Sequence, residues 1–266
     1  MTTPHDAPVP LSPGGDDWPE LVRKIRARTP ARLLAGRAGG SYRTTTQLEL
    51  REAHAAARDA VRAELDLQND LGTALVEHWK LFEVCTQAAN KDEYLLRPDL
   101  GRRFSDAAQR AIAQRCPRDR DLQIAIGDGL SVTAVVAQVP ELLKLLFQGA
   151  AARGWSVGQT FVVRHCRVGI LNQIGELLTP QVAILLLGER PGLATAESLS
   201  AYMAYRPARA HTDADRNLIS NIHARGVTPA EAAGRILNLA ARMRAASAGG
   251  AAIREELPAQ ATGFLP

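Results

Sequence analysis

The stretch Val182-Ala183-Ile184-Leu185-Leu186-Leu187, followed by Gly188-Glu189-Arg190-Pro191-Gly192, decides the fold class. Six apolar residues in a row, with no polar position between them, predict a strand buried on both faces, as in a parallel sheet. The glycine-rich segment then ends the strand. A second stretch has the same form: Leu122-Gln123-Ile124-Ala125-Ile126 stops at Gly127-Asp128-Gly129. Two more strands are expected, over 161–163 and 199–205.

Helical patterns separate these strands. They cover 131–153 and 172–178, and a last helix runs from Thr228 to about Arg244. Thr228-Pro229-Ala230-Glu231 predicts a capping box with proline at the first helical position. Strands alternating with helices predict an α/β fold with a mostly parallel, Rossmann-like sheet.

The part of the chain before Pro117 has a different pattern. Residues 1–18 are rich in proline, glycine and aspartate and are expected to be a disordered N-terminal segment. Residues 19–117 are expected to form a helical region, with a capping box at Thr44 to Gln47 and helices over 70–79 and around Phe104 to Ile112. Residues 118–266 then form the α/β domain.

Composition excludes several classes of protein. The chain has 266 residues, 46% hydrophobic and 5% aromatic, which is enough for a sizeable aliphatic core. It has no signal-peptide pattern and no apolar run near the roughly 18 residues of a membrane span. Three cysteines far apart, without a C-x-x-C pair, argue against a disulfide framework and a zinc site and favour a reducing cytoplasm.

The net charge of +4 comes mostly from arginine, because only four of the 32 basic residues are lysines. The densest basic stretch runs from Arg23 to Arg43. Nucleic-acid binding would require interleaved aromatic side chains, and Tyr42 alone is present. A solvated or subunit-facing helix surface is therefore the preferred interpretation, and no nucleic-acid or membrane partner is expected.

Two strand ends carry a carboxylate each, Asp128 and Glu189. If their strands are neighbours, both loops face one crevice at the carboxyl edge of the sheet, where ligands of such folds bind. Residues 127–131 either cradle a phosphate or form a tight turn with Ser131 as the N-cap. Residues 188–192 either form a ligand loop or a rigid turn with a Glu189–Arg190 ion pair.

Candidate catalytic groups are scarce. Asn221 to Gly226 nearly spells D-x-H-x-x-G, the motif in which a histidine replaces the base below a cobalamin's cobalt. The leading residue is Asn rather than Asp, so a helix-end turn is the preferred interpretation. No Ser-His-Asp, Cys-His or paired-carboxylate arrangement is evident. This absence favours a binding subunit over a complete enzyme.

Seven stretches, in order, resemble the small subunit of ethanolamine ammonia-lyase along nearly the whole chain after residue 18. They are Gly36-Arg37-Ala38-Gly39, Tyr94-Leu95-Leu96-Arg97-Pro98-Asp99-Leu100-Gly101-Arg102-Arg103, Asp128-Gly129-Leu130-Ser131, Gln173-Ile174-Gly175-Glu176, Gly188-Glu189-Arg190-Pro191-Gly192-Leu193, Glu197-Ser198-Leu199-Ser200 and Ser220-Asn221-Ile222-His223.

The resemblance implies an adenosylcobalamin-dependent lyase that converts ethanolamine to acetaldehyde and ammonia by radical chemistry. It implies that the substrate site lies in a large (β/α)8 subunit and that several heterodimers assemble. The small subunit clamps the cofactor with Val168, Glu189 and Leu218, and supplies no catalytic residue and no metal ligand. Relatives place a cysteine at position 218. On this basis residues 19–117 contact the large subunit and residues 118–266 contact the cobalamin.

Packaging in a bacterial microcompartment is not expected, because residues 1–17 are short, proline-rich and without an amphipathic helix; the free cytoplasm is preferred. Two alternatives stay open. The chain could be a stand-alone corrinoid or nucleotide binding module, or a purely structural partner.

Overall fold

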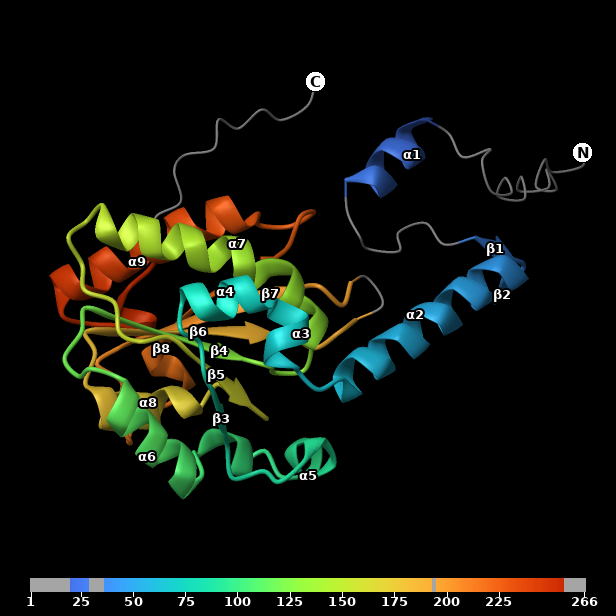
Figure 1. Cartoon of the computed structure of the whole chain (residues 1–266). Coiled ribbons are helices and arrows are strands. Elements are labelled where there is room, and N and C mark those ends of the chain that lie inside the picture. The colour runs from blue at the N-terminus through green and yellow to red at the C-terminus, as the bar shows by residue number, and fades with distance from the viewer. Residues whose placement is uncertain (1–19, 29–35, 193–194, 256–266) are drawn as a thin grey trace, which may run out of the picture.

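A computed structural model of the chain describes residues 20–28, 36–192 and 195–255 (Figure 1). The expected disordered segment 1–18 lies outside these residues. The strands are β1 (Arg37–Ala38), β2 (Ser41–Tyr42), β3 (Glu83–Cys85), β4 (Leu122–Gly127), β5 (Phe161–Arg164), β6 (Val182–Gly188), β7 (Leu199–Tyr205) and β8 (Arg216–Ile222). The helices are α1 (Glu20–Ala27), α2 (Thr44–Arg62), α3 (Leu67–Leu71), α4 (Thr73–His78), α5 (Lys91–Leu96), α6 (Asp106–Arg115), α7 (Val132–Ala151), α8 (Ile170–Leu178) and α9 (Pro229–Ala246), with short 3-10 turns at Leu100–Arg102, Asp213–Asp215 and Gly250–Ala252.

The main sheet has six strands in the described part of the chain, in the order β3-β5-β4-β6-β7-β8. Strands β3, β5, β4 and β6 are parallel, whereas β7 and β8 add to one edge in antiparallel fashion. The predicted mostly parallel α/β fold is therefore confirmed. Every residue of β4 and β6 is buried, as the apolar runs in the sequence predicted.

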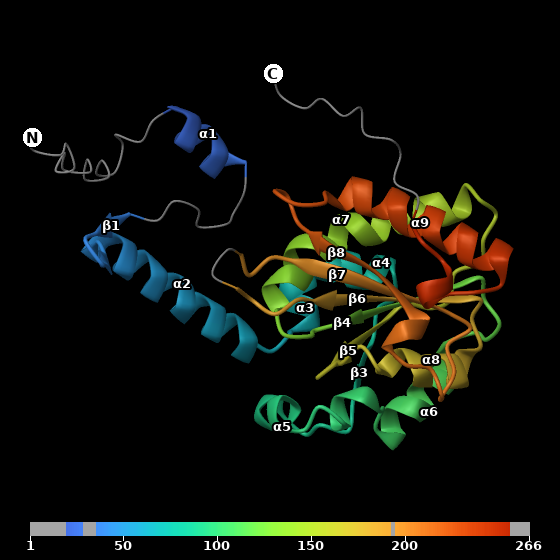
Figure 2. The same cartoon turned by 180° about the vertical axis from the view of Figure 1, so that it is seen from behind.

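Helices cover the two faces of the sheet unequally (Figures 1 and 2). Side chains alternate along β6, so Ile184 and Leu186 pack into one core with α7 and α9, and Ala183 and Leu185 pack into a second core with α6 and α8. The second core contains no β8 residue among those described. The outer face of β8 therefore lacks a helical cover, and Leu218 on that face is 47% exposed.

Strands β3 and β8 were not predicted. Strand β3 has only three residues, and it comes from the mainly helical region 19–117 to pair with β5. Strand β8 buries only Ile219 and Ile222, so its sequence lacks a clean two-residue alternation. Both segments are strands because they pair with a neighbouring strand, β3 with β5 and β8 with β7, which the local sequence does not show.

The helix ends follow the predicted caps in part. Ser131 caps α7 by accepting from Ala134 N at 3.2 Å, and Thr228 caps α9 with Pro229 as its first residue. The predicted capping box at Thr44 is wrong. Thr44 is already the first residue of α2, so the N-cap position falls on Arg43, whose side chain makes no capping hydrogen bond. The predicted helix 70–79 is broken at Gly72, where φ is +81° and the helical ladder cannot continue.

Helix α2 projects away from the body of the molecule, with the β1–β2 hairpin at its far end (Figures 1 and 2). Of its 19 residues only Ala60 is buried. A helix with so little burial gains little from packing within this chain.

Candidate functional site

The two glycine-rich turns meet at the carboxyl edge of the sheet, as predicted. Strands β4 and β6 are parallel neighbours, with Gly127 paired to Leu187. Leu130 N donates to Gly188 O at 3.1 Å. Gly129 has φ +57°, and a Cβ there would lie 2.4 Å from Gly188 O. Glycine is therefore required both for the backbone conformation and for the close approach.

Asp128 does not face the crevice that the sequence suggested. Its carboxylate is buried and accepts from the backbone N–H of His165 and of Cys166, at 2.9 Å each. Lys91 Nζ lies 3.6 Å from Oδ2 and donates to Gly129 O at 3.1 Å. Asp128 thus binds the end of β5 from inside and does not share a site with Glu189.

Glu189 is held at the other side of the turn pair. Its Oε1 accepts from Ser200 Oγ at 2.7 Å and from Asn221 N at 2.8 Å. Among the described residues, Oε2 has no hydrogen-bond partner, and Glu189 forms no ion pair with Arg190. The alternative of a rigid turn with a Glu189–Arg190 pair is therefore not what holds the carboxylate; two neighbouring strands fix one oxygen and leave the second for another donor.

Val168 and Leu218 line one cavity of about 940 Å³ between α8 and the face of β7 and β8 that carries Tyr202 and Leu218. Tyr202, the cross-strand partner of Leu218, also lines this cavity. Burial raises the pKa of the Tyr202 hydroxyl, and the negative charge of Glu189 raises it further. Glu189 is outside this cavity but close to its wall along the sheet, because it accepts a hydrogen bond from Ser200, two residues before Tyr202 on the same face of β7.

The same cavity carries a positive charge. Arginines outnumber carboxylates in its wall. The arginines are Arg102, Arg103, Arg167, Arg209 and Arg216, and the carboxylates are Asp99, Glu176 and Asp213. The sequence pattern did not reveal Ser200, Tyr202 or this arginine group. Alternation along β7 places Ser200 and Tyr202 on one face, but the sequence does not show that this face borders a cavity.

The near-match to D-x-H-x-x-G is a structural turn, as preferred from the sequence, but it lies between the end of β8 and the start of α9 and not at the end of a helix. His223 is 3% exposed, its Nδ1 accepts from Arg225 N at 3.2 Å, and its Nε2 pairs with Asn221 Oδ1 at 2.7 Å. Both ring nitrogens are therefore occupied within the turn, and neither is available to a metal in this arrangement.

Ser131 is likewise occupied. Its hydroxyl accepts from Ala134 N and donates to Ala196 O. The hydroxyl hydrogen is therefore not directed to a phosphate, and the tight-turn interpretation of residues 127–131 describes the geometry.

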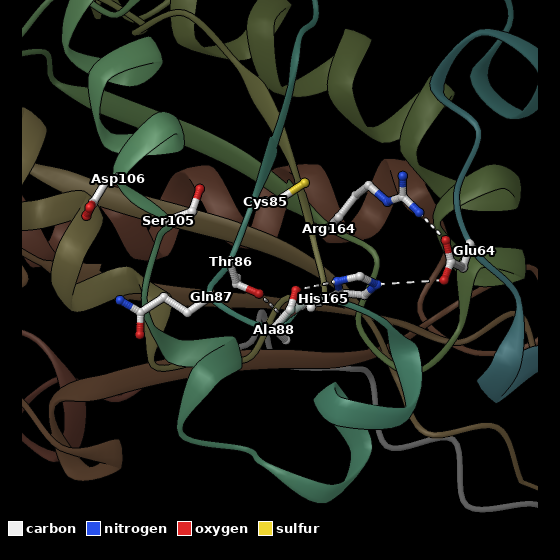
Figure 3. Close-up of a pocket in the computed structure, with 10 residues that line it drawn as sticks. Glu64, Cys85, Thr86, Gln87, Ala88, Ser105, Asp106, Arg164 and His165 are labelled. Carbon is white, nitrogen blue, oxygen red and sulfur yellow. Dashed lines mark hydrogen bonds and ion pairs between the residues drawn. The ribbon is translucent and has the colours of Figure 1, made fainter.

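A second cavity, of about 480 Å³, lies where β3 and β5 end (Figure 3). Arg164 pairs there with Glu64, and its second nitrogen is 3.5 Å from Glu83. His165, with φ +56°, directs Nδ1 to Ala88 O at 3.1 Å, so Nδ1 carries a hydrogen. Its Nε2 is 3.9 Å from Glu64 Oε1, too far for a hydrogen bond (Figure 3).

In the described part of the chain, no group of three or more His, Cys, Asp or Glu side chains is placed to hold a metal ion. Cys85 is exposed, Cys116 and Cys166 are buried, and all three are free thiols. Burial raises the pKa of Cys116 to about 12 and that of Cys166 well above its usual range. Neither buried thiol is therefore a ready nucleophile.

None of the described helices combines the length and apolar character that crossing a bilayer requires.

The family model for the ethanolamine ammonia-lyase light chain matches residues 19–254. The chain is 43% identical over 220 residues to the ethanolamine ammonia-lyase small subunit of Clostridium perfringens, covering 83% of this chain and 72% of the relative. It is 39% identical to the small subunit of Clostridium acetobutylicum, covering 83% and 88%, and 42% identical to that of Listeria monocytogenes serovar 1/2a, covering 81% and 72%. With most of both chains matched, this protein belongs to the ethanolamine ammonia-lyase small-subunit family.

Proposed function

We propose that this chain holds adenosylcobalamin against a large subunit, and that the complex converts ethanolamine to acetaldehyde and ammonia. One observation carries the proposal. Val168 and Leu218 line one cavity beside the exposed face of β8, and Glu189 is hydrogen-bonded to Ser200, which lies on the same face of β7 as Tyr202 in the cavity wall. A face that bears polar anchors and an exposed leucine, but no helix, is suited to a large ligand or a partner.

The chemistry of these residues fits a corrin. Leu218 and Val168 offer apolar contact. Glu189 has its Oε1 fixed by Ser200 and Asn221, so its Oε2 can accept hydrogen bonds from the N–H groups of corrin side-chain amides. Fixing Glu189 beforehand reduces the entropy lost when a ligand binds. Because Leu218 contacts through apolar surface, the replacement of the cysteine of relatives leaves this contact in place.

Adenosylcobalamin, when bound, supplies the radical chemistry. This chain then binds and orients the cofactor and keeps water away from it. At the wall of the larger cavity Thr212 Oγ1 donates to Asp215 Oδ2 at 3.0 Å, but this pair forms the capping box of the Asp213–Asp215 turn. Its use in the turn supports a non-catalytic role, with the substrate site on the large subunit.

We place the large subunit against two surfaces, the exposed face of β8 around Leu218 and the projecting helix α2. The second belongs to residues 19–117, which we propose as the subunit-contacting region, with residues 118–266 as the cobalamin-contacting domain. Helix α2 buries only Ala60 within the chain, and Leu48 on it is 57% exposed. We further propose that several heterodimers assemble, in the cytoplasm and without a nucleic-acid or membrane partner.

The test is a reconstitution. The chain is co-expressed with an ethanolamine ammonia-lyase large subunit of the same source, and acetaldehyde is assayed with and without adenosylcobalamin. Activity should require both chains and the cofactor. Glu189→Ala should raise the KM for adenosylcobalamin with assembly intact, whereas Glu141→Gln, an exposed change on α7, should not.

Other outcomes identify the alternatives. Tight binding of corrinoid or nucleotide by the isolated chain in equilibrium dialysis, without complex formation, would identify a stand-alone binding module. An unchanged cofactor KM in Glu189→Ala would favour a purely structural partner.

A further inference from the structure

The loop of residues 165–169 leads from β5 to α8 and carries Val168. We propose that Asp128 is a positioning residue that holds this loop, so that the part of the cofactor site provided by this chain is formed before cofactor or partner binds. This inference rests on the proposed function and adds a residue and a role to it.

Asp128 holds the loop from inside the sheet. Each oxygen of its buried carboxylate accepts one backbone N–H, Oδ2 from His165 and Oδ1 from Cys166, both at 2.9 Å. Hydrogen bonds from a charged acceptor are stronger than those between neutral groups. Lys91, with a side chain 7% exposed, balances the charge at 3.6 Å and is fixed by Gly129 O at 3.1 Å.

The opposite side of the loop is held by α5 and the segment before it. Thr86 Oγ1 donates to His165 O at 3.0 Å, and Tyr94 Oη donates to Cys166 O at 3.1 Å. Arg167 donates to Tyr94 O at 3.0 Å and lies over the Tyr94 ring at 4.2 Å. The N–H and C=O groups of His165 and Cys166 are thus both bound by side chains.

This arrangement is more elaborate than a stable fold requires. A buried ion pair contributes little net stability, because desolvation offsets the attraction between the charges. His165 adopts φ +56°, a left-handed conformation that is unfavourable for a residue with a Cβ. Such strain persists where surrounding contacts impose it, and here it directs the chain towards Val168 at the wall of the larger cavity.

The first measurement is amide hydrogen exchange on the full chain, which needs neither cofactor nor partner. In Asp128→Asn the side-chain amide can accept only one of the two N–H groups. Exchange at His165 and Cys166 should accelerate by on the order of tenfold, with that of β4 unchanged. Asp92→Asn, an exposed change on the same helix as Lys91, is the matched control and should alter neither.

The second measurement is the KM for adenosylcobalamin in the reconstituted complex. Asp128→Asn should raise this KM by on the order of tenfold with kcat nearly unchanged at saturation, because cofactor binding must then also order the loop. The double variant Asp128→Asn/Lys91→Met removes the unbalanced charge but leaves one N–H without its acceptor. It should regain stability while the KM stays raised.

Three results would overturn the inference: unchanged exchange at His165 and Cys166 in Asp128→Asn, an unchanged KM despite faster exchange, or a KM restored in the double variant. The proposed function fails differently, because the wild-type complex itself would then show no adenosylcobalamin-dependent activity.

Discussion

The contact between the two glycine-rich turns is tested by Gly129→Ala. A methyl group at this position would lie 2.4 Å from Gly188 O and 3.0 Å from Gly188 N. Both atoms belong to the backbone at the end of β6, so they cannot move aside as the end of a flexible side chain can. The turn or the strand end must shift.

The cost has two parts. Placing a Cβ at φ +57° costs about 1–2 kcal/mol, and forcing a methyl group against packed backbone costs about 1–3 kcal/mol more. The free energy of unfolding should therefore fall by about 2–5 kcal/mol, a large part of the roughly 5–15 kcal/mol typical of a domain.

The assay is equilibrium urea unfolding followed by circular dichroism, with Gly154→Ala as the control. Gly154 has φ +68°, but no atom lies within 4 Å of its added Cβ, so only the conformational cost of about 1–2 kcal/mol applies. Equal losses in the two variants would refute the argument that the two turns are in close contact.

Three further predictions follow from burial and charge. In the native protein a thiol reagent should modify Cys85 and spare the two buried cysteines, whereas denatured protein should react at all three; rapid reaction of more than one thiol would contradict the burial. Burial raises the pKa of Asp121, but bonds from Ser156 and Arg244 outweigh this and leave the pKa below its usual value. The stabilisation by the ionised Asp121 is therefore present above its unfolded pKa of about 4 and is lost as pH falls through the folded pKa. In urea unfolding, Asp121→Asn should lower the free energy of unfolding by about 1 kcal/mol at pH 7 and by less as the pH drops below 4. A difference between the two proteins that does not change with pH would argue against this reasoning. Leu218→Asp, on the exposed face of β8, should leave the free energy of unfolding within about 0.5 kcal/mol of wild type. It should weaken either the complex with the large subunit, measured by co-purification, or the affinity for the cofactor, measured by KM. A large loss of stability would place Leu218 in the core instead.

Local pattern was sufficient for the central elements. The apolar run of β6 has no polar position for solvent, and its short length and the glycine-rich segment after it favour a strand covered on both faces over a buried helix. Ser131 and Thr228 begin their helices because a side-chain oxygen satisfies an otherwise unpaired N–H, a contact made within three residues. Motif resemblance, rather than physical pattern, indicated the family.

The sequence by itself therefore determined the parallel core, its helices and the two glycine-rich turns, since those depend on residues close together in the chain. Only the tertiary structure decided that Asp128 turns inward and Glu189 does not. The partners of Asp128 are backbone groups 37 and 38 residues away, and those of Glu189 come from β7 and β8. The exposure of Leu218 was also decided in three dimensions, because it depends on the absence of a helix over β8 in the described chain, and local sequence does not encode which face a distant helix will cover.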